Sequence, residues 1–151
     1  NSRGDHITRQ LKIYFSGAIS AGRERQPLYA RMVEFMQARG LDVLSAHVAH
    51  ANVLHAEAQR SAQEIFTRDL QMVAACEAMI AEVSRPSLGV GYEIASALQW
   101  QKPVLCLCDK EVFLTRMLTG NTDANLRIVF YSTDEEWQNA ISTFCDHLKQ
   151  D

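Results

Sequence analysis

The chain has 151 residues, of which 47% are hydrophobic and 22% are charged, and its formal net charge is −3. This length and composition predict one globular domain with a full hydrophobic core. The negative net charge argues against a protein that wraps nucleic acid or lies on an anionic membrane. No apolar run approaches the ~20 residues that a membrane span needs. Residues 1–10 form a polar extension without the hydrophobic segment of a signal peptide, so we expect a soluble, intracellular protein.

Short apolar runs alternate with helical signals along the rest of the chain. Strands are predicted at residues 11–15, 42–46, 78–83, 104–108 and 127–131. Helices are predicted to begin at Pro27, at the capping box Ser61-x-x-Glu64, at about Tyr92, at Glu111 and at Thr133 or Asp134. Residues 47–60 have weak periodicity, and their structure stays open. The alternation predicts that residues 11–151 form a doubly wound α/β domain of the Rossmann or flavodoxin type, with a five-stranded parallel sheet.

The four cysteines lie inside apolar segments, which is typical of small core residues rather than of a disulfide set. Cys106 and Cys108 would share one face of a strand, but no second cysteine pair accompanies them. We therefore expect neither a metal ion nor another cofactor.

The stretch 81–93 reads as a strand, a Pro/Ser/Gly turn and then a helix. In an open parallel sheet, ligands bind beyond the carboxyl ends of the strands, where the first N–H groups of a helix are unpaired. Gly89 and Gly91 would let the backbone approach an anion, Ser87 would add a hydroxyl group, and Glu93 would lie in the first helical turn. The alternative interpretation is that the glycines only shape a turn and that Glu93 only complements the helix dipole.

Two further polar residues are placed where apolar ones are expected. Asp69 lies four residues from both Ile65 and Val73, so it shares their apolar helix face, and a carboxylate there needs a partner. It could instead lie at the edge of the stripe in contact with water. Tyr14 lies near the carboxyl end of the first strand, although a strand tyrosine often serves only for packing. Two carboxylates beside an anion site indicate glycosyl transfer, with one as nucleophile and the other holding or moving a proton.

The sequence resembles the nucleoside 2-deoxyribosyltransferase-like proteins, and within them the 2'-deoxynucleoside 5'-monophosphate N-glycosidases. The resemblance extends from Ile13 to about Tyr131. Its most specific part is Ala-Glu-Val at 81–83 with Pro-Ser-Leu-Gly-Val-Gly-Tyr-Glu at 86–93. Shorter matches are Tyr14-Phe15, Gly17, Gly22-Arg23, His47-Val48-Ala49 and Asp69-Leu70.

The resemblance implies a role for each of these positions. Glu93 would be the nucleophile, Asp69 would assist at the base or the water, and Tyr14 would orient Glu93 and crowd the sugar C2' position. The implied substrate contacts are Gly17, Ile19, Ser20, Arg23, His47, Ser87, Gly89, Gly91 and Thr115. The implied assembly is a homodimer in which Thr115 of one subunit completes the phosphate site of the other. The implied location is the cytoplasm, with the nucleus as a second compartment.

One segment departs from the family pattern. Where the phosphate-binding relatives read Gly-Ser-Ile-Arg-Gly-Gly-Arg, residues 17–23 read Gly-Ala-Ile-Ser-Ala-Gly-Arg. The serine hydroxyl is missing at Ala18 and the arginine at Ser20, and a lost charge-assisted contact is worth about 1.5–3 kcal/mol. Arg23, Arg25 or Arg116 could supply the charge from elsewhere. The sequence therefore specifies the reaction type more firmly than the phosphate on the substrate.

Several alternatives remain open at this point. His47, His50 and His55 could bind a metal, but one base-contacting histidine among surface ones is the better interpretation. Three functions are compatible with the residues: hydrolysis of a deoxynucleoside monophosphate, base exchange between deoxynucleosides, and non-enzymatic nucleotide binding.

Overall fold

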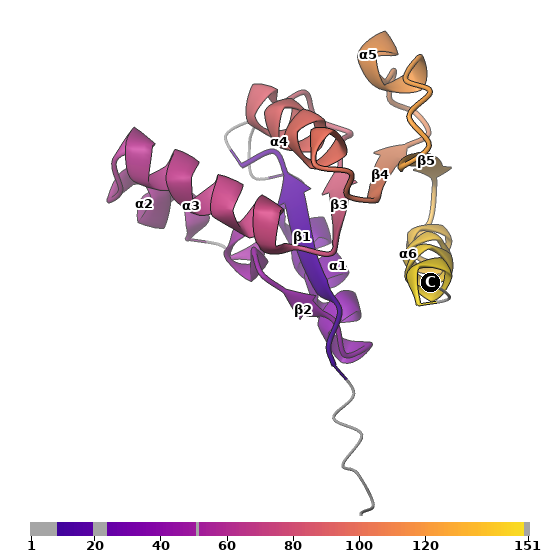
Figure 1. The fold of residues 1–151 in the computed structure, drawn as a ribbon, viewed down its shortest axis with the longest axis horizontal. Helices are drawn as coiled ribbons and strands as arrows, with labels where there is room; N and C mark the ends of the chain where they lie inside the picture. Colours follow the sequence, from indigo (N-terminus) through magenta and orange to yellow (C-terminus); the bar gives the residue numbers. More distant parts are fainter. Residues whose placement is uncertain (1–8, 20–23, 51, 150–151) are drawn as a thin grey trace, which may run out of the picture.

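The protein is described by a computed structural model that covers residues 9–19, 24–50 and 52–149. Its strands form one sheet in the order β2-β1-β3-β4-β5, and every neighbouring pair is parallel (Figure 1). The strands are β1 (Lys12–Gly17), β2 (Asp42–Val43), β3 (Ala78–Glu82), β4 (Val104–Asp109) and β5 (Leu126–Tyr131). The helices are α1 (Gln26–Ala38), η1 (Ala46–Ala49, 3-10), α2 (Val53–Ala58), α3 (Ala62–Ala75), α4 (Leu88–Gln99), α5 (Arg116–Thr119) and α6 (Asp134–Leu148). The predicted doubly wound α/β fold is confirmed.

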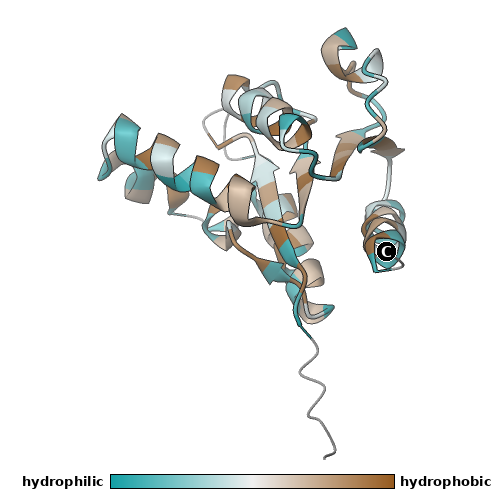
Figure 2. Ribbon diagram, in the orientation of Figure 1, coloured by the Kyte–Doolittle hydropathy of each residue, from teal (hydrophilic) through white to brown (hydrophobic). Residues whose placement is uncertain are grey.

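Helices cover both faces of the sheet, and each face has its own buried cluster. Helices α1 and α6 pack on one face, where the cluster includes Phe15 and the fully buried Trp137. Helices α3 and α4 pack on the other, where the cluster includes Tyr14 and Ile94. Hydrophobic colours cover much of β3 and β4 in Figure 2, whereas the carboxyl end of β1 is pale. Because both faces are buried, these strands have apolar residues at nearly every position instead of alternating with polar ones.

The second strand is shorter than predicted, since β2 ends at Val43 and not at residue 46. The buried hydroxyl of Ser45 accepts a hydrogen bond from the Phe15 amide (2.8 Å) and donates one to the Phe15 carbonyl oxygen (2.6 Å). A side chain thus satisfies the backbone groups that a longer strand would pair, and the chain turns into η1.

Other element boundaries also differ from the prediction. The stretch 47–60, whose weak periodicity predicts no element, contains most of η1 and all of α2. The helix expected at 111–118 is only the single turn α5, because Thr115 accepts a hydrogen bond from the Met117 amide and begins the helix there. In the last helix Thr133, one of the two predicted caps, is the N-cap.

The polar extension at residues 1–10 lies mostly outside the described residues, and its boundary stays a prediction. Of its members, Arg9 forms an ion pair with Glu77 at 2.8 Å. None of the helices in the described part of the chain is long and apolar enough to cross a membrane.

Candidate active site

The strand-turn-helix stretch at 81–93 forms as β3, a loop and α4, but the helix begins earlier than predicted. Ser87 is the N-cap, and its hydroxyl accepts a hydrogen bond from the Val90 amide at 3.2 Å. The prediction that Gly89 and Gly91 lie in the loop is therefore wrong, since both belong to the first turn of α4. The Gly91 amide donates to the Ser87 carbonyl oxygen (3.1 Å) and is not free for an anion. Glu93 lies in the second turn, not the first.

Three predicted catalytic residues come together at one site: Tyr14 from β1, Asp69 from α3 and Glu93 from α4. The pKa of Glu93 is raised to about 7, first by burial and then by the charge of Asp69. The hydroxyl groups of Tyr14 and Ser16 oppose this rise in pKa, because they favour the charged carboxylate. Burial and the charges of Glu93 and Asp69 raise the pKa of Tyr14, so its hydroxyl group stays protonated and serves as a donor.

One oxygen of the Glu93 carboxylate, the buried Oε2 atom, lacks a hydrogen-bond partner in the described part of the chain. A buried carboxylate with an unused oxygen is costly to keep ionised, and groups of this kind concentrate at functional sites. The arrangement suits a nucleophile that is ionised near neutral pH and whose charge is neutralised when it forms a bond.

Asp69 has the partner that its position on an apolar helix face required. Its Oδ1 atom accepts a hydrogen bond from Arg68 Nε at 2.9 Å, and Arg68 also bonds to Glu57 Oε1 at 2.8 Å. Sequence reasoning missed Arg68 and Glu57. No signal in the sequence could have paired them, because Glu57 belongs to the stretch whose structure was left open.

His47 lies in η1 beside this group, with its Nε2 atom 3.8 Å from Glu57 Oε1. Burial and the charge of Arg68 lower the pKa of His47, so the imidazole is neutral at pH 7. His47, His50, Glu57 and Arg68 help to line a cavity of about 410 Å³ between η1, α2 and α3. His55 is exposed on α2. Among the described residues, no group of three His, Cys, Asp or Glu side chains could hold a metal ion.

The loop after β1 is described only in part. Gly17 faces the ring of Tyr29, and a Cβ atom at Gly17 would approach the Tyr29 Cζ atom to 2.9 Å, so only glycine fits. Ile19 packs against the cluster on the α1 and α6 face. Ser20 and Arg23 lie outside the described residues, and their substrate contacts stay predictions.

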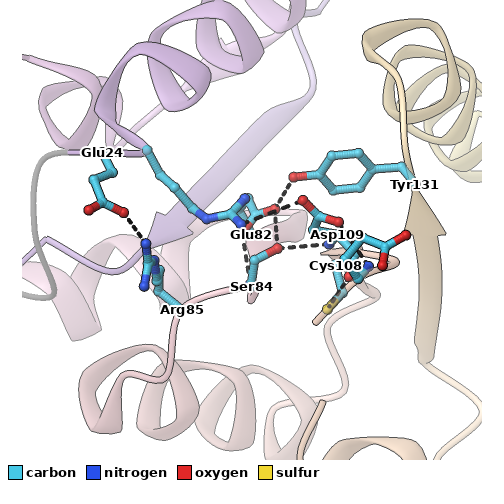
Figure 3. Close-up of polar contacts among 9 residues, drawn as sticks. Glu24, Glu82, Ser84, Arg85, Cys108, Asp109 and Tyr131 are labelled. Atoms are coloured by element: carbon cyan, nitrogen blue, oxygen red, sulfur yellow. Dashed lines mark hydrogen bonds and ion pairs between the residues drawn. The ribbon is translucent and has the colours of Figure 1, made fainter. Parts of the chain in front are cut away.

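A second cavity, of about 330 Å³, lies between α4 and α5. Ser87 and Thr115 line it together with Arg85, a residue that sequence reasoning did not select. Arg85 forms an ion pair with Glu24, as Figure 3 shows. Arg25, one of the alternative cations, lies 3.6 Å from Asp109.

Glu82 ends β3 directly before this loop, and its side chain is completely buried. Its carboxylate accepts hydrogen bonds from the Ser84 amide (2.8 Å), the Ser84 hydroxyl (2.9 Å) and the Tyr131 hydroxyl (Figure 3). The Ser84 hydroxyl in turn accepts from the Asp109 amide at 2.8 Å. This network links the ends of β3, β4 and β5 and fixes the start of the loop that carries Arg85 and Ser87.

The fold and the site together define a doubly wound α/β enzyme with a carboxylate pair at the carboxyl edge of its sheet. A family model described as nucleoside 2-deoxyribosyltransferase matches residues 13–124. The chain belongs to this family, which confirms the predicted resemblance.

Curated relatives extend over most of the chain. A putative 2'-deoxynucleoside 5'-phosphate N-hydrolase 1 of Methanococcoides burtonii is 39% identical over 118 residues, which cover 78% of this chain and 97% of the relative. The 5-hydroxymethyl-dUMP N-hydrolase of Rattus norvegicus is 41% identical over 117 residues, which cover 75% of this chain and 71% of the relative. The prediction of an enzyme of the N-hydrolase kind agrees with these names.

Solved structures share the fold at low sequence identity. The CMP N-glycosidase of Clostridium botulinum aligns with a TM-score of 0.63 and 16% identity, over 87% of this chain and 98% of that one. A 2-desoxiribosyltransferase from Leishmania mexicana aligns with a TM-score of 0.59 and 16% identity, over 91% and 98%. At this identity the comparison supports the architecture alone.

Proposed function

We propose that the protein hydrolyses the bond between base and deoxyribose in 2'-deoxynucleoside 5'-monophosphates, releasing a free nucleobase and deoxyribose 5-phosphate. Family membership and the names of the curated relatives support the reaction type. The observation that carries the proposal is the Glu93 carboxylate, one oxygen of which is buried without a partner among the described residues, and whose pKa is shifted by the Tyr14 hydroxyl and the Asp69 carboxylate from the neighbouring elements β1 and α3. A non-enzymatic nucleotide-binding module has no use for two carboxylates held so close together.

The chemistry follows a retaining glycosidase. In the first step an oxygen of Glu93 bonds to the anomeric carbon while the carbon–nitrogen bond breaks, and the departing base takes a proton delivered through Asp69. In the second step water attacks the same carbon, Asp69 takes a proton from that water, and the Glu93 carboxylate is released. The Tyr14 hydroxyl holds Glu93 in line, and the Tyr14 ring fills the space beside C2', which favours deoxyribose over ribose.

The cavity between α4 and α5 is the proposed site of the 5'-phosphate. Ser87 and Arg85 line this cavity and supply a hydroxyl donor and a positive charge. The N-terminus of α4 follows directly after Ser87. Arg85, in the loop after β3, would then supply the positive charge that Ser20, in the loop after β1, cannot supply.

We also propose a homodimer that shares this site. The side chains of Phe113 and Met117, which line the cavity, are 83% and 82% exposed, and Leu88 at the start of α4 is 97% exposed. Large apolar side chains gathered on a surface are typical of a protein–protein contact. A second copy of the chain seated there would bring its Thr115 to the phosphate.

A product assay tests the proposal. Purified protein is incubated with a panel of deoxynucleoside monophosphates, with and without free adenine. Released base together with deoxyribose 5-phosphate is the expected result, and a Glu93→Ala variant that stays folded should lose turnover by several orders of magnitude. Base exchange that requires added adenine would favour the transferase alternative, and binding without any base release would favour the binding module. Near-native turnover in Glu93→Ala would remove Glu93 as nucleophile.

A further inference from the structure

Arg68 contacts two carboxylates at once. Its Nη2 atom lies 2.8 Å from Glu57 Oε1 on α2, and its Nε and Nη2 atoms each lie 2.9 Å from Asp69 Oδ1 on its own helix. The side chains of Arg68, Glu57 and Asp69 are 25%, 13% and 20% exposed. Charge-assisted bonds with this shielding hold side chains more firmly than surface ion pairs do.

The contacts leave one edge of Asp69 available. Both bonds from Arg68 reach Oδ1, and the Oδ2 atom accepts no hydrogen bond from a described residue. Helix α3, which carries Asp69, packs against β1 and α4, and the charge of Asp69 raises the pKa of Tyr14 and that of Glu93. The guanidinium therefore determines how the free edge of Asp69 is presented to the other two catalytic side chains.

Glu57 gives independent support for this role. Its Oε2 atom is buried and has no hydrogen-bond partner among the described residues. A buried carboxylate with one unused oxygen is unfavourable for stability unless a cation compensates it. His47 is 3.8 Å away and is neutral at pH 7, because its pKa is lowered by burial. Arg68 is therefore the cation that compensates the charge of Glu57, and Glu57 in turn holds the Arg68 side chain in place.

We propose that Arg68 is a positioning residue of the active site, which holds the Asp69 carboxylate against the Tyr14–Glu93 pair while Glu57 fixes the orientation of Arg68. The proposal rests on the function proposed above. It places the control of the catalytic carboxylates on α2, a helix that contributes no catalytic residue itself.

Arg68 also acts on the charge of Glu93. The groups that face Glu93 are Tyr14 and Ser16 from β1, and Asp69 and Arg68 from α3. Strand β4 presents thiol groups on this face of the sheet, and burial raises their pKa, so they stay neutral. The cation of Arg68 favours the ionised form of Glu93, and removing it should raise the pKa of Glu93.

The first experiment needs no substrate. The Glu93 carboxyl group is titrated by ¹³C NMR in the wild type and in Arg68→Met, Arg68→Lys and Arg31→Met variants of the full chain. Arg31 forms a similar arginine–carboxylate pair with Asp134 on the exposed side of α1, so Arg31→Met is the matched control. The midpoint should rise in Arg68→Met and stay near the wild-type value in Arg68→Lys and in the control. An unchanged midpoint in a folded Arg68→Met variant would overturn the electrostatic part of the proposal.

The second experiment separates positioning from binding. A misplaced catalytic group typically costs about 100-fold in rate. Arg68→Met should therefore lower kcat by about that factor with little change in KM, and Arg68→Lys should recover part of the loss. Glu57→Gln, which keeps the shape and one acceptor, should lower kcat less than Arg68→Met does.

These outcomes are distinguishable from a failure of the proposed function. If the wild type releases no base, the function falls, while the NMR titration still reports on Arg68. If the wild type is active and Arg68→Met and Glu57→Gln both keep its kcat, Arg68 has no positioning role. If Arg68→Met does not fold, the Glu57→Gln result alone decides in the same way.

Discussion

The hydroxyl group of Tyr131, at the end of β5, donates a hydrogen bond to the carboxylate of Glu82, at the end of β3, across the intervening strand β4. Burial raises the pKa of Glu82, while Tyr131 and Ser84 favour its charged form. A hydrogen bond to a charged group contributes about 1.5–3 kcal/mol to stability. Tyr131→Phe should reduce the free energy of unfolding in urea by this amount at pH 7. Tyr92→Phe, which changes a largely exposed tyrosine, is the control and should change it little.

Glu93 should cost the protein stability at neutral pH. Its pKa rises from 4.5 to about 7 on folding, so the native state binds more protons than the unfolded chain between these values, and stability falls as the pH rises through this window. Above pH 7 the penalty is about 3 kcal/mol, since each pKa unit is worth about 1.4 kcal/mol. Glu93→Gln should therefore be inactive but more stable than the wild type at pH 8, by up to this amount. Urea unfolding at pH 4 and pH 8 measures the difference, which should shrink strongly at pH 4. A Glu93→Gln variant no more stable at pH 8 would show that the carboxylate is better solvated than its burial implies.

Turnover should depend on the ionisation of the same group. Because the nucleophile must be the carboxylate, kcat/KM should fall below a pH of about 7 as Glu93 is protonated. Tyr14→Phe removes a hydroxyl group that favours the charged form, so the acidic limb of the profile should move to higher pH. A profile that is flat from pH 5 to 8 would contradict the role given to Glu93.

The sugar preference should survive in that variant. Phenylalanine keeps the aromatic ring that is proposed to crowd C2', so Tyr14→Phe should still prefer deoxyribonucleotides, whereas Tyr14→Ala should accept ribonucleotides better. Rates on matched ribo- and deoxyribonucleotides measure the ratio. Equal ratios in wild type and Tyr14→Ala would show that a residue other than Tyr14 crowds the C2' position.

Binding of the substrate's 5'-phosphate should depend on Arg85. A lost charge-assisted bond corresponds to about a 10- to 100-fold loss of affinity. Arg85→Gln should therefore raise KM for the monophosphate by roughly this factor without changing KM for the free nucleoside. Glu24→Gln frees Arg85 from its ion pair and should lower KM for the monophosphate, and both effects should shrink as salt screens the attraction. If Arg85→Gln leaves the preference unchanged, the phosphate lies away from the cavity between α4 and α5.

Much of the fold was predictable because its signals are local. The strands that are covered on both faces are uninterrupted apolar runs, and the Ser61 capping box and the Thr133 cap mark helix starts correctly. The predicted start of α4 is too late, because Gly89 and Gly91 are typical of loops. In the structure the cap at Ser87 lets both glycines form a helical turn. The length of β2 depends on Ser45 and Phe15, which are thirty residues apart, and no local pattern contains that contact.

The site shows the same division. The sequence singles out Asp69 and Glu93, because a carboxylate on an apolar helix face and one beside a pair of glycines are both unusual, and their catalytic roles stay predictions. Arg68 and Arg85 were not, since their roles depend on Glu57 and Glu24, which approach them only in the folded chain. An arginine in a sequence carries no sign of which carboxylate it will meet.

The sheet separates the carboxylate of Glu82 from that of Glu93. Glu82 faces α1 and α6 with Tyr131, whereas Glu93 lies on the opposite side with Tyr14. Helix α6 packs on β4, β5 and α1, and none of its residues is among the groups that shift the pKa of Glu93. A chimaera that takes its α6 from a distant relative should therefore keep the acidic limb of the native rate profile.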